Sequence, residues 1–194
     1  MKSEEQTIAH KKDNMRRIML QKRNSLAYDT INTKSVEIQQ RFTNSYEFNH
    51  VKILASYFPT GSEVRTEKII SAALKSNRLV ALPRTEGEDI KFYQIFLSTN
   101  LILGRFGIKE PPISSNSLVS DDIDLLLVPG ILFDTRGYRI GYGYGYYDKF
   151  IAKKKKSTLS VGLAYECQMC EEIPRSNYDQ KINILVTEKR MLYF

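Results

Sequence analysis

The sequence has only two histidines among its 194 residues. This scarcity argues against nucleophilic catalysis by a Ser-His-Asp or Cys-His group, because such a group needs a histidine as its base. No stretch approaches the roughly 18 consecutive apolar residues of a membrane helix, and the N-terminal residues lack the apolar core of a signal peptide. We therefore expect a cytoplasmic protein with no membrane partner.

Cysteine is equally rare. Cys167 and Cys170 are the two cysteines of the chain and form a C-x-x-C pattern, which a redox pair or half of a zinc site would also show. A zinc site needs a full set of nitrogen or sulfur ligands, whereas His10 and His50 lie far away in the sequence. We interpret the two cysteines as small side chains in a short helix or turn.

The length of 194 residues fits one folding unit. A chain of this size buries roughly 70% of the surface that its unfolded form exposes, so it needs no disulfide to fold. Apart from residues 137–148, no internal repeat or low-complexity tract is visible. We predict a single domain over residues 1–194 and expect a monomer.

The formal net charge of +7 favours an anionic partner. A nucleic acid, a nucleotide or a polyacidic small molecule would all satisfy it. The lysine run at residues 153–156 fits the solvated end of a helix, where cations suit the helix dipole, or a nonspecific nucleic-acid patch. No RNA-binding motif is present, so we expect no specific nucleic-acid partner.

The distribution of apolar residues predicts helices first and strands later. Ile8, Met15, Met19 and Leu26 recur at helical spacing and predict a helix over residues 8–28, followed by a second helical stretch near residues 31–48. Short apolar runs then follow at residues 51–58, 78–83, 90–96, 122–130, 159–165 and 182–188. Continuous runs of Val, Ile and Leu are typical of strands buried on both faces, so we predict an α/β fold with a largely parallel sheet covered by helices.

A glycine-tyrosine loop, GYRIGYGYGYYD, occupies residues 137–148. Glycines permit positive φ and close backbone approach, so Gly141, Gly143 and Gly145 can turn N–H groups inward to bind an anion. A helix starting near Tyr146 would point its free amides at the same phosphate, and Arg139 would add a charged donor. The loop follows the strongly apolar stretch 124–134, which predicts a position at the carboxyl edge of the sheet. The alternative is a purely structural turn.

Two further features bear on a phosphate site. Lys12, Arg16 and Arg23 project from nearly the same face of the first helix, so they either clamp a polyphosphate or form an ordinary solvated face. Asp148 closes the loop, where it would bind Mg²⁺ between itself and the phosphates or simply complement the helix dipole. The loop has neither the lysine-hydroxyl pair of a Walker A motif nor the spacing G-x-G-x-x-G. The residues alone therefore indicate an anion or nucleotide site that depends on Mg²⁺.

Four segments add a resemblance that covers nearly the whole chain. They are KDNMR, YFPTGSEVRTEKII, DLLLVPGILFDTRGYRIGYGYGYYDKF and NYDQKINILVTEK. In order and spacing they resemble the 5-formyltetrahydrofolate cyclo-ligase family, also called methenyltetrahydrofolate synthetase. The third segment is the most specific, because it contains P-G-x-x-F-D-x-x-G-x-R-[LI]-G followed by G-Y-Y-D.

The resemblance implies both fold and reaction. The fold is a three-layer α/β sandwich with a mostly parallel central sheet and N-terminal helices. The reaction converts 5-formyltetrahydrofolate to 5,10-methenyltetrahydrofolate with ATP as co-substrate and Mg²⁺ as cofactor, releasing ADP and phosphate. The phosphoryl group of ATP is transferred to the formyl oxygen, and nitrogen 10 of the folate then attacks the activated carbon.

The resemblance also implies roles for individual residues. ATP contacts are expected at Lys12, Asp13, Asn14, Met15, Arg16, Arg139, Ile140, Gly141, Tyr142, Gly143, Tyr144, Gly145, Tyr146 and Tyr147. Folate contacts are expected at Arg16, Phe58, Glu63, Tyr142, Gly143, Tyr144, Gly145 and Tyr146. The Mg²⁺ ligands are expected to be Asp148 and Asp179, and the catalytic residues Arg16, Arg139 and Tyr146. A pterin ring has N–H groups at its edge and two flat faces, which suits an acidic acceptor and aromatic neighbours.

Three positions depart from the family pattern. Tyr144 stands where many family loops have glycine or a basic residue, Tyr178 where histidine is frequent, and Asn183 where aspartate is common. None of these changes removes an expected ligand. Two alternative functions stay open at this point: a catalytically silent nucleotide or folate binder, and a basic RNA-associated protein.

Overall fold

The computed structural model describes residues 2–104, 107–114, 116–118 and 122–194. Its helices are α1 (Lys2–Asn24), α2 (Tyr28–Thr43), α3 (Tyr46–His50), α4 (Glu67–Lys75), α5 (Tyr146–Lys153) and the 3-10 helix η3 (Glu166–Gln168). Its strands are β1 (Ile53–Ala55), β2 (Leu79–Glu86), β3 (Asp89–Ile95), β4 (Ile102–Leu103), β5 (Lys109–Glu110), β6 (Ser117–Leu118), β7 (Leu125–Val128), β8 (Leu132–Asp134), β9 (Arg139–Ile140), β10 (Leu159–Leu163), β11 (Met169–Cys170), β12 (Ile184–Val186) and β13 (Met191–Tyr193).

A mostly parallel sheet forms the centre of the molecule, as the sequence predicts. Within the described residues its strand order is β13-β12-β10-β7-β1-β2-β3-β6. The five strands from β12 to β2 run parallel, whereas β13, β3 and β6 pair antiparallel at the two sides. The four residues of β7 are all buried, which is what the apolar run Leu125–Val128 indicates for a central strand.

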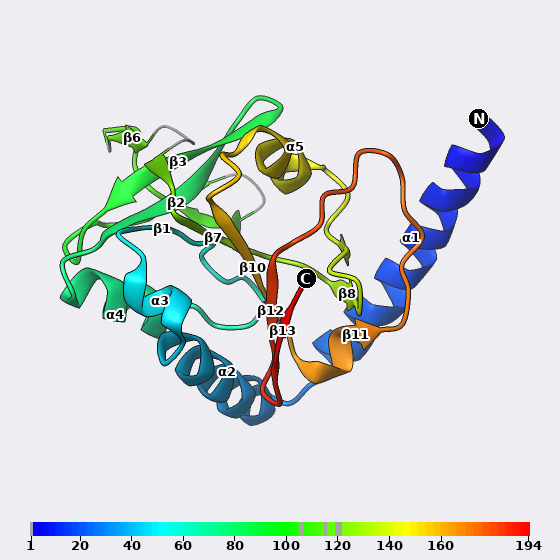
Figure 1. Ribbon diagram of the computed structural model, residues 1–194, viewed down its shortest axis with the longest axis horizontal. Coiled ribbons are helices and arrows are strands. Elements are labelled where there is room, and N and C mark those ends of the chain that lie inside the picture. Colours follow the sequence, from blue (N-terminus) through cyan, green and yellow to red (C-terminus); the bar gives the residue numbers. More distant parts are fainter. Residues whose placement is uncertain (1, 105–106, 115, 119–121) are drawn as a thin grey trace.

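Helices cover both faces of this sheet (Figure 1). Helices α2, α3 and α4 pack against one face through a large apolar cluster that includes Ile38, Phe48 and Ile69. The other face is covered by α5 and by β8, which contribute Ile151 and Phe133 to a second cluster. The three-layer α/β architecture is therefore confirmed.

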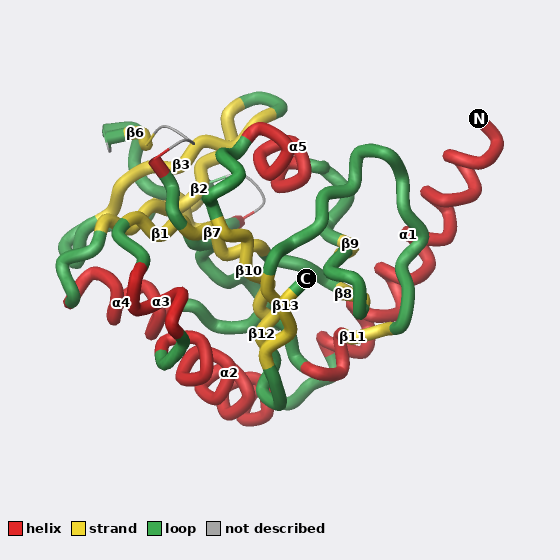
Figure 2. The backbone as a smooth tube through the Cα atoms, viewed as in Figure 1, coloured by secondary structure: helices red, strands yellow, loops and turns green. Residues whose placement is uncertain are grey.

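A small sheet of strands β11-β8-β9 lies beside α1 on the second face (Figure 2). Met19 of α1 packs in a third apolar cluster against this sheet, with Ile131, Ile140 and Ile173. The N-terminal half of α1 extends beyond the body of the molecule, as Figure 1 shows. Helix α1 is thus fixed to the fold near its C-terminal end.

The strand order predicts where a ligand binds. Strand β1 is flanked by β2 and β7, and the chain leaves β1 toward α4 on one face of the sheet. From β7 the chain continues to β8, β9 and α5 on the other face. Connections that diverge to opposite faces leave a crevice at the carboxyl ends of two neighbouring strands. A binding site is therefore expected beyond the ends of β1 and β7.

Several local predictions need correction. The second helical stretch is two helices: α2 ends at Thr43 with Asn44 as its C-cap, and Ser45 caps α3 by accepting a hydrogen bond from the Phe48 N–H at 3.2 Å. The apolar stretch 124–134 is also two strands, β7 and β8, which lie in different sheets. The first helix ends at Asn24, so Leu26 packs on the core from beyond its end.

The remaining predictions fall on α5 and η3. Helix α5 begins at Tyr146 as predicted and ends at Lys153, the first residue of the lysine run. Lys154 is half-buried and donates to the Thr158 carbonyl, so it is not part of a solvated helix end.

Cys167 lies in η3 and Cys170 in β11, and both are free thiols. None of the described helices is long and apolar enough to cross a membrane.

Candidate active site

A cavity of about 420 Å³ opens beyond the carboxyl ends of β1 and β7. Its walls include Phe58 and Glu63 from the segment after β1, Pro129 from the turn after β7, and the glycine-tyrosine loop. The crevice that the strand order predicts is therefore present. The expected site residues that line it are Lys12, Phe58, Glu63, Arg139, Ile140, Gly141, Tyr142, Gly143, Tyr144, Gly145, Tyr146, Tyr147, Asp148 and Asp179.

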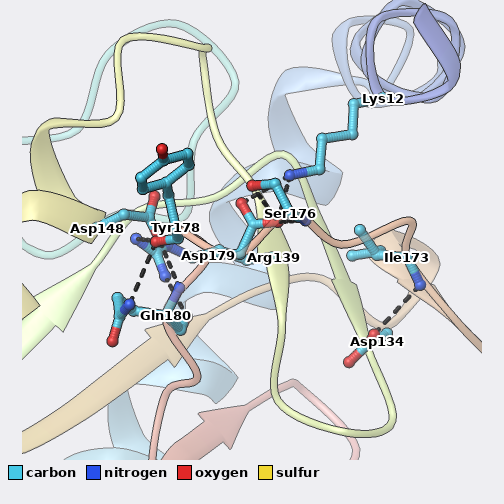
Figure 3. A network of polar contacts seen from close by, with 9 residues as sticks. All are labelled: Lys12, Asp134, Arg139, Asp148, Ile173, Ser176, Tyr178, Asp179 and Gln180. Carbon is cyan, nitrogen blue, oxygen red and sulfur yellow. Dashed lines mark hydrogen bonds and ion pairs between the residues drawn. The ribbon is translucent and has the colours of Figure 1, made fainter. Parts of the chain in front are cut away.

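Two ion pairs lie at this cavity (Figure 3). Lys12 reaches from α1 to Asp179 and donates to both carboxylate oxygens, at 2.6 Å for Oδ1. Arg139 Nη2 lies 3.3 Å from Asp148 Oδ1. Two of the expected phosphate-binding cations, Lys12 and Arg139, are thus paired with the expected metal ligands.

The backbone of residues 176–180 holds both carboxylates in position. The Gln180 N–H donates to Asp148 Oδ1 at 3.0 Å, and the Ser176 N–H donates to Asp179 Oδ2 at 2.6 Å. The Gln180 carbonyl also accepts from Arg139 Nη1 at 3.1 Å. This short segment therefore connects the two ion pairs, although it lies far from the loop in sequence.

Arg139 is a buried cation. It is 6% exposed in strand β9, and burial lowers its pKa, while Asp148 and Asp179 oppose that shift. A buried guanidinium requires nearby negative charge or hydrogen-bond acceptors. Its contacts with Asp148 and the Gln180 carbonyl supply both and fix its orientation at the cavity wall.

The basic face of α1 points toward the protein. Lys12 and Arg16 are half-buried and Arg23 is buried, so the alternative of an ordinary solvated face is wrong. Arg16 Nε donates to the Gly141 carbonyl at 2.8 Å, and its guanidinium lies next to Gly143. Arg16 therefore supports the backbone of the glycine-tyrosine loop.

Four expected ATP contacts do not line the cavity. They are Asp13, Asn14, Met15 and Arg16. Asp13 is exposed and pairs with Arg16, and Asn14 accepts from Arg17 at 2.8 Å. Met15 packs against the apolar cluster beside the small sheet. Of the segment 12–16, only Lys12 reaches the cavity in this conformation.

The glycines of the loop have different roles. Gly143 and Gly145 have φ values of 104° and 70°, a region that side chains rarely adopt. Gly145 caps the N-terminus of α5 in this conformation. Gly141 has no positive φ, and a Cβ there would have open space around it. Conformational need therefore explains Gly143 and Gly145 and not Gly141.

The intervening tyrosines point in several directions. The Tyr142 hydroxyl accepts from Arg23 Nη2 at 2.9 Å. The Tyr144 and Tyr146 rings stack with centroids 5.8 Å apart, and both residues border the cavity. Burial raises the pKa of Tyr147, so its hydroxyl stays protonated. The loop thus presents one flat aromatic surface and two hydroxyl groups with distinct surroundings.

Glu63 is the buried carboxylate of the cavity. It is 5% exposed and accepts from the Thr60 N–H at 2.9 Å. Burial raises its pKa, which the Thr60 N–H and Arg23 partly oppose. Phe58 stands near it in sequence with Lys109 Nζ 5.6 Å from its ring centroid. The cavity wall therefore combines an acidic acceptor with an aromatic face.

Several cavity residues were not predicted from the sequence. Thr85 in β2 and Glu110 in β5 both line it, and the Thr85 N–H donates to Glu110 Oε1 at 3.2 Å. Pro129 is another, and Tyr57, Thr60, Pro83, Ile90 and Ile108 complete the set. Pro129 carried a signal, because it ends the apolar run of β7, where ligands of parallel sheets bind. Nothing in the local pattern around Thr85 or Glu110 indicated a site.

The positions that depart from the family pattern have visible environments. Asn183 Oδ1 accepts from the Ser160 N–H and hydroxyl at 2.9 and 2.8 Å, so its amide connects the start of β12 to β10. Tyr178 is 78% exposed beside Asp179. Tyr144 takes part in the ring stack of the loop. Of the three, only Tyr144 borders the cavity.

The carboxylates at the cavity are suited to a hard divalent cation. Mg²⁺ binds proteins through one or two carboxylates and completes its shell with water and substrate phosphates. Asp148 uses Oδ1 for its contacts with both Arg139 and Gln180, so Oδ2 is available among the described contacts. No cluster of three or more metal-ligating side chains occurs within the described residues. The donor set therefore fits a metal that arrives with phosphates.

Comparison with known proteins agrees with this geometry. Residues 8–188 match the model of the 5-formyltetrahydrofolate cyclo-ligase family. A probable 5-formyltetrahydrofolate cyclo-ligase of Schizosaccharomyces pombe is 31% identical over 94% of this chain and 97% of its own length. The 5-formyltetrahydrofolate cyclo-ligase of Haemophilus influenzae is 34% identical over 73% of this chain and 79% of its own.

A solved structure extends the comparison to the fold. The 5,10-methenyltetrahydrofolate synthetase of Aquifex aeolicus superposes with a TM-score of 0.85 at 34% identity, covering 94% of this chain and 92% of that one. The sequence match, the shared fold and the cavity at the glycine-tyrosine loop lead to one conclusion. The chain belongs to the 5-formyltetrahydrofolate cyclo-ligase family.

Proposed function

We propose that this enzyme cyclises 5-formyltetrahydrofolate to 5,10-methenyltetrahydrofolate and uses ATP and Mg²⁺ to do so, with release of ADP and phosphate. One observation carries the proposal. A single cavity is lined both by the charged group Lys12, Arg139, Asp148 and Asp179 and by the group Phe58, Glu63 and Tyr142. The first group suits a polyphosphate with its metal, and the second suits a pterin ring.

The charged group supports phosphoryl transfer. Lys12 and Arg139 supply positive charge beside the transferring phosphoryl group, and the amides at the start of α5 face the same loop. Bound Mg²⁺ would neutralise phosphate charge, held by Asp148 and Asp179. Arg16 acts indirectly in this scheme, because its side chain donates to the Gly141 carbonyl and so supports the loop.

Glu63 and the aromatic side chains support folate binding. The Glu63 carboxylate accepts N–H groups at the pterin edge, while Phe58 and the stacked pair Tyr144 and Tyr146 offer flat surfaces. Tyr147 lines the same cavity, and Glu63 and Arg139 act on its pKa in opposite directions. The formyl group of a bound folate would then face the phosphates of ATP, as phosphoryl transfer requires.

The chemistry needs no nucleophilic side chain. The formyl oxygen takes the terminal phosphoryl group of ATP and ADP is released. Nitrogen 10 then attacks the formyl carbon and loses its proton to the departing phosphate or to water, and the ring closes as phosphate leaves with the former formyl oxygen. The work of the protein is positioning and charge neutralisation, which agrees with a cavity lined by cations, carboxylates and aromatic rings.

The test follows the near-ultraviolet absorbance of methenyltetrahydrofolate. Purified protein is mixed with 5-formyltetrahydrofolate and ATP, with Mg²⁺ present or chelated. We expect absorbance to grow only when ATP and Mg²⁺ are both present. A folded protein that binds ATP and 5-formyltetrahydrofolate without forming product would instead be a silent binder. Product formation that continues in full with a chelator would contradict the role given to Mg²⁺.

A further inference from the structure

Arg23 is one of the largest fully buried side chains of the protein. It lies in the last turn of α1 and is 2% exposed. Its guanidinium donates to three neutral groups: Ser62 Oγ at 3.0 Å, the Gly130 carbonyl at 3.1 Å and the Tyr142 hydroxyl at 2.9 Å. These partners belong to the segment after β1, the turn after β7 and the glycine-tyrosine loop. Arg23 therefore joins three parts of the cavity wall.

The negative charge that balances Arg23 is not in direct contact with it. Among the described residues, no carboxylate is within ion-pair distance of Arg23. The Tyr142 hydroxyl, however, accepts from Arg23, and Tyr142 and Glu63 line the same cavity and shift each other's pKa. Because the lone pair of the hydroxyl faces the guanidinium, its proton can be donated to the carboxylate. Tyr142 thus couples a buried cation to a buried anion.

Arg23 itself does not line the cavity, whereas Tyr142 and Glu63 do. It can therefore affect a ligand only through these two residues. Burial raises the pKa of Glu63, and the positive charge of Arg23 opposes that rise. The other titratable or charged groups that face Glu63 or its backbone are Tyr57, Arg65, Tyr142, Tyr147 and Tyr165. Of these and Arg23, only the two arginines carry charge near neutral pH.

We propose that Arg23 is a positioning residue for folate binding: it orients the Tyr142 hydroxyl toward Glu63 and keeps that carboxylate ionised and fixed to accept N–H groups of the pterin. This inference rests on the proposed function, because it takes Glu63 as the pterin acceptor. Arg23 contacts no ligand in this scheme. Its role is separate from the cations Lys12 and Arg139, which serve the phosphates.

The test is calorimetric binding of 5-formyltetrahydrofolate without ATP, at about pH 6 and about pH 8.5, on either side of neutrality. Without Arg23 the pKa of Glu63 rises further, so as the pH falls the carboxylate becomes protonated at a higher pH than in the wild type. Arg23→Gln should therefore weaken folate binding about 10- to 100-fold at the lower pH, the size of one charged hydrogen bond, and less at the higher pH. Its ATP dissociation constant should stay within about twofold of the wild type.

Two more variants make the result decisive. Tyr142→Phe removes only the hydroxyl of a half-exposed ring, so it should fold and reproduce the pH-dependent loss even if Arg23→Gln does not fold. Lys22→Gln removes the same charge from the neighbouring exposed position on α1 and should bind folate as the wild type does. An equal loss at both pH values in Arg23→Gln or Tyr142→Phe would overturn the proposal. Failure of the wild type to bind folate at all would overturn the proposed function instead.

Discussion

Glu63 combines its proposed role in folate binding with a cost to the folded state. Because burial raises its pKa in the folded protein, the unfolded chain releases the proton at a lower pH. Between the unfolded and folded pKa values the unfolded state binds fewer protons, so stability falls as pH rises through that window. Above the window the cost is fully present, although Arg23 and the Thr60 N–H reduce it.

Glu63→Gln therefore should separate stability from binding. At about pH 8 its free energy of unfolding should equal or exceed that of the wild type, because the uncharged amide carries no ionisation cost. Its apparent KM for 5-formyltetrahydrofolate should rise at least about tenfold, since a charged acceptor is lost. Urea denaturation over a pH series and steady-state kinetics measure the two effects. A variant clearly less stable than the wild type at pH 8 would show that Glu63 is needed for the fold.

Arg139 and Arg136 provide a matched pair of arginines in one hairpin. Arg139 is buried at the cavity, while Arg136 is half-exposed and pairs with Glu172. We expect Arg139→Ala to lower kcat/KM for ATP about 10- to 100-fold, through the loss of one charged contact with phosphate. Arg136→Ala should stay within about twofold of the wild type. Wild-type ATP kinetics in a folded Arg139→Ala protein would leave this arginine with a structural role only.

At this scale the sequence predicted most of the residues that line the cavity but not their pairings. Helical spacing correctly placed Lys12, Arg16 and Arg23 on one face of α1. Spacing cannot say whether that face meets water or protein, because this depends on packing by residues far along the chain. The partner of Lys12 is Asp179, 167 positions away in sequence. A contact of that separation leaves no local pattern to read.

Among the elements, the glycine-tyrosine loop allows a test within one short segment. Gly145 has a positive φ with open space around it, and Gly141 has the same open space without the positive φ. An alanine at Gly145 therefore meets conformational strain alone. We expect Gly145→Ala to lower the free energy of unfolding by about 1 to 2 kcal/mol.

The comparison variant for stability is Gly141→Ala, which should change the free energy of unfolding by less than about 0.5 kcal/mol. Both values come from denaturant midpoints measured in the same buffer. Equal destabilisation by the two substitutions would mean that the left-handed backbone at Gly145 is not what selects glycine there. The start of α5 would then need another explanation.

The predicted elements were right where the apolar runs were long and uniform. The run Leu125–Val128 is the central strand β7, as its four buried residues show. The continuation to Asp134 was read as the same strand, yet Pro129 and Gly130 turn the chain out of the central sheet. Most of the run 90–96 lies in β3, which is only partly buried and pairs antiparallel with β2 near one edge of the sheet. Continuous apolar sequence does not reveal a change of sheet.

On the scale of the whole molecule, the charged groups of the cavity pair with one another. Lys12 is paired with Asp179 and Arg139 with Asp148, so the cations proposed to bind phosphate contact the carboxylates proposed to bind metal. Phosphate binding by Lys12 competes with Asp179 unless a metal takes the carboxylate. Nucleotide and metal binding should therefore strengthen each other, since each releases the partner that the other needs.

This coupling predicts an unusual gain of affinity. Asp179→Asn should bind ATP without Mg²⁺ roughly threefold to tenfold more tightly than the wild type, in the range of one partly exposed charge contact. Addition of Mg²⁺ should also increase the ATP affinity of Asp179→Asn less than that of the wild type. Titration calorimetry with and without a chelator measures both. Weaker metal-free binding in Asp179→Asn would contradict the competition.

The control for net charge is Glu172→Gln. Glu172 is a half-exposed carboxylate that pairs with Arg136 and Arg175 away from the cavity. Its substitution changes the charge of the protein by the same amount as Asp179→Asn. Metal-free ATP binding should not tighten in this control. If it does, the gain comes from the overall field of the protein and not from the release of Lys12.

Helix α1 also fixes the distance between two of its contacts with the rest of the protein. Lys12 contacts Asp179 near one end of its C-terminal half, and Arg23 contacts Tyr142 at the other. At the rise of an α-helix these two anchors are about 16 Å apart along one rigid rod. A one-residue insertion between them would rotate one anchor by about 100° relative to the other, so no side-chain adjustment could restore both. The number of residues between the two anchors is therefore fixed by the positions of Asp179 and Tyr142, while most of the amino acids that fill the interval are free to vary.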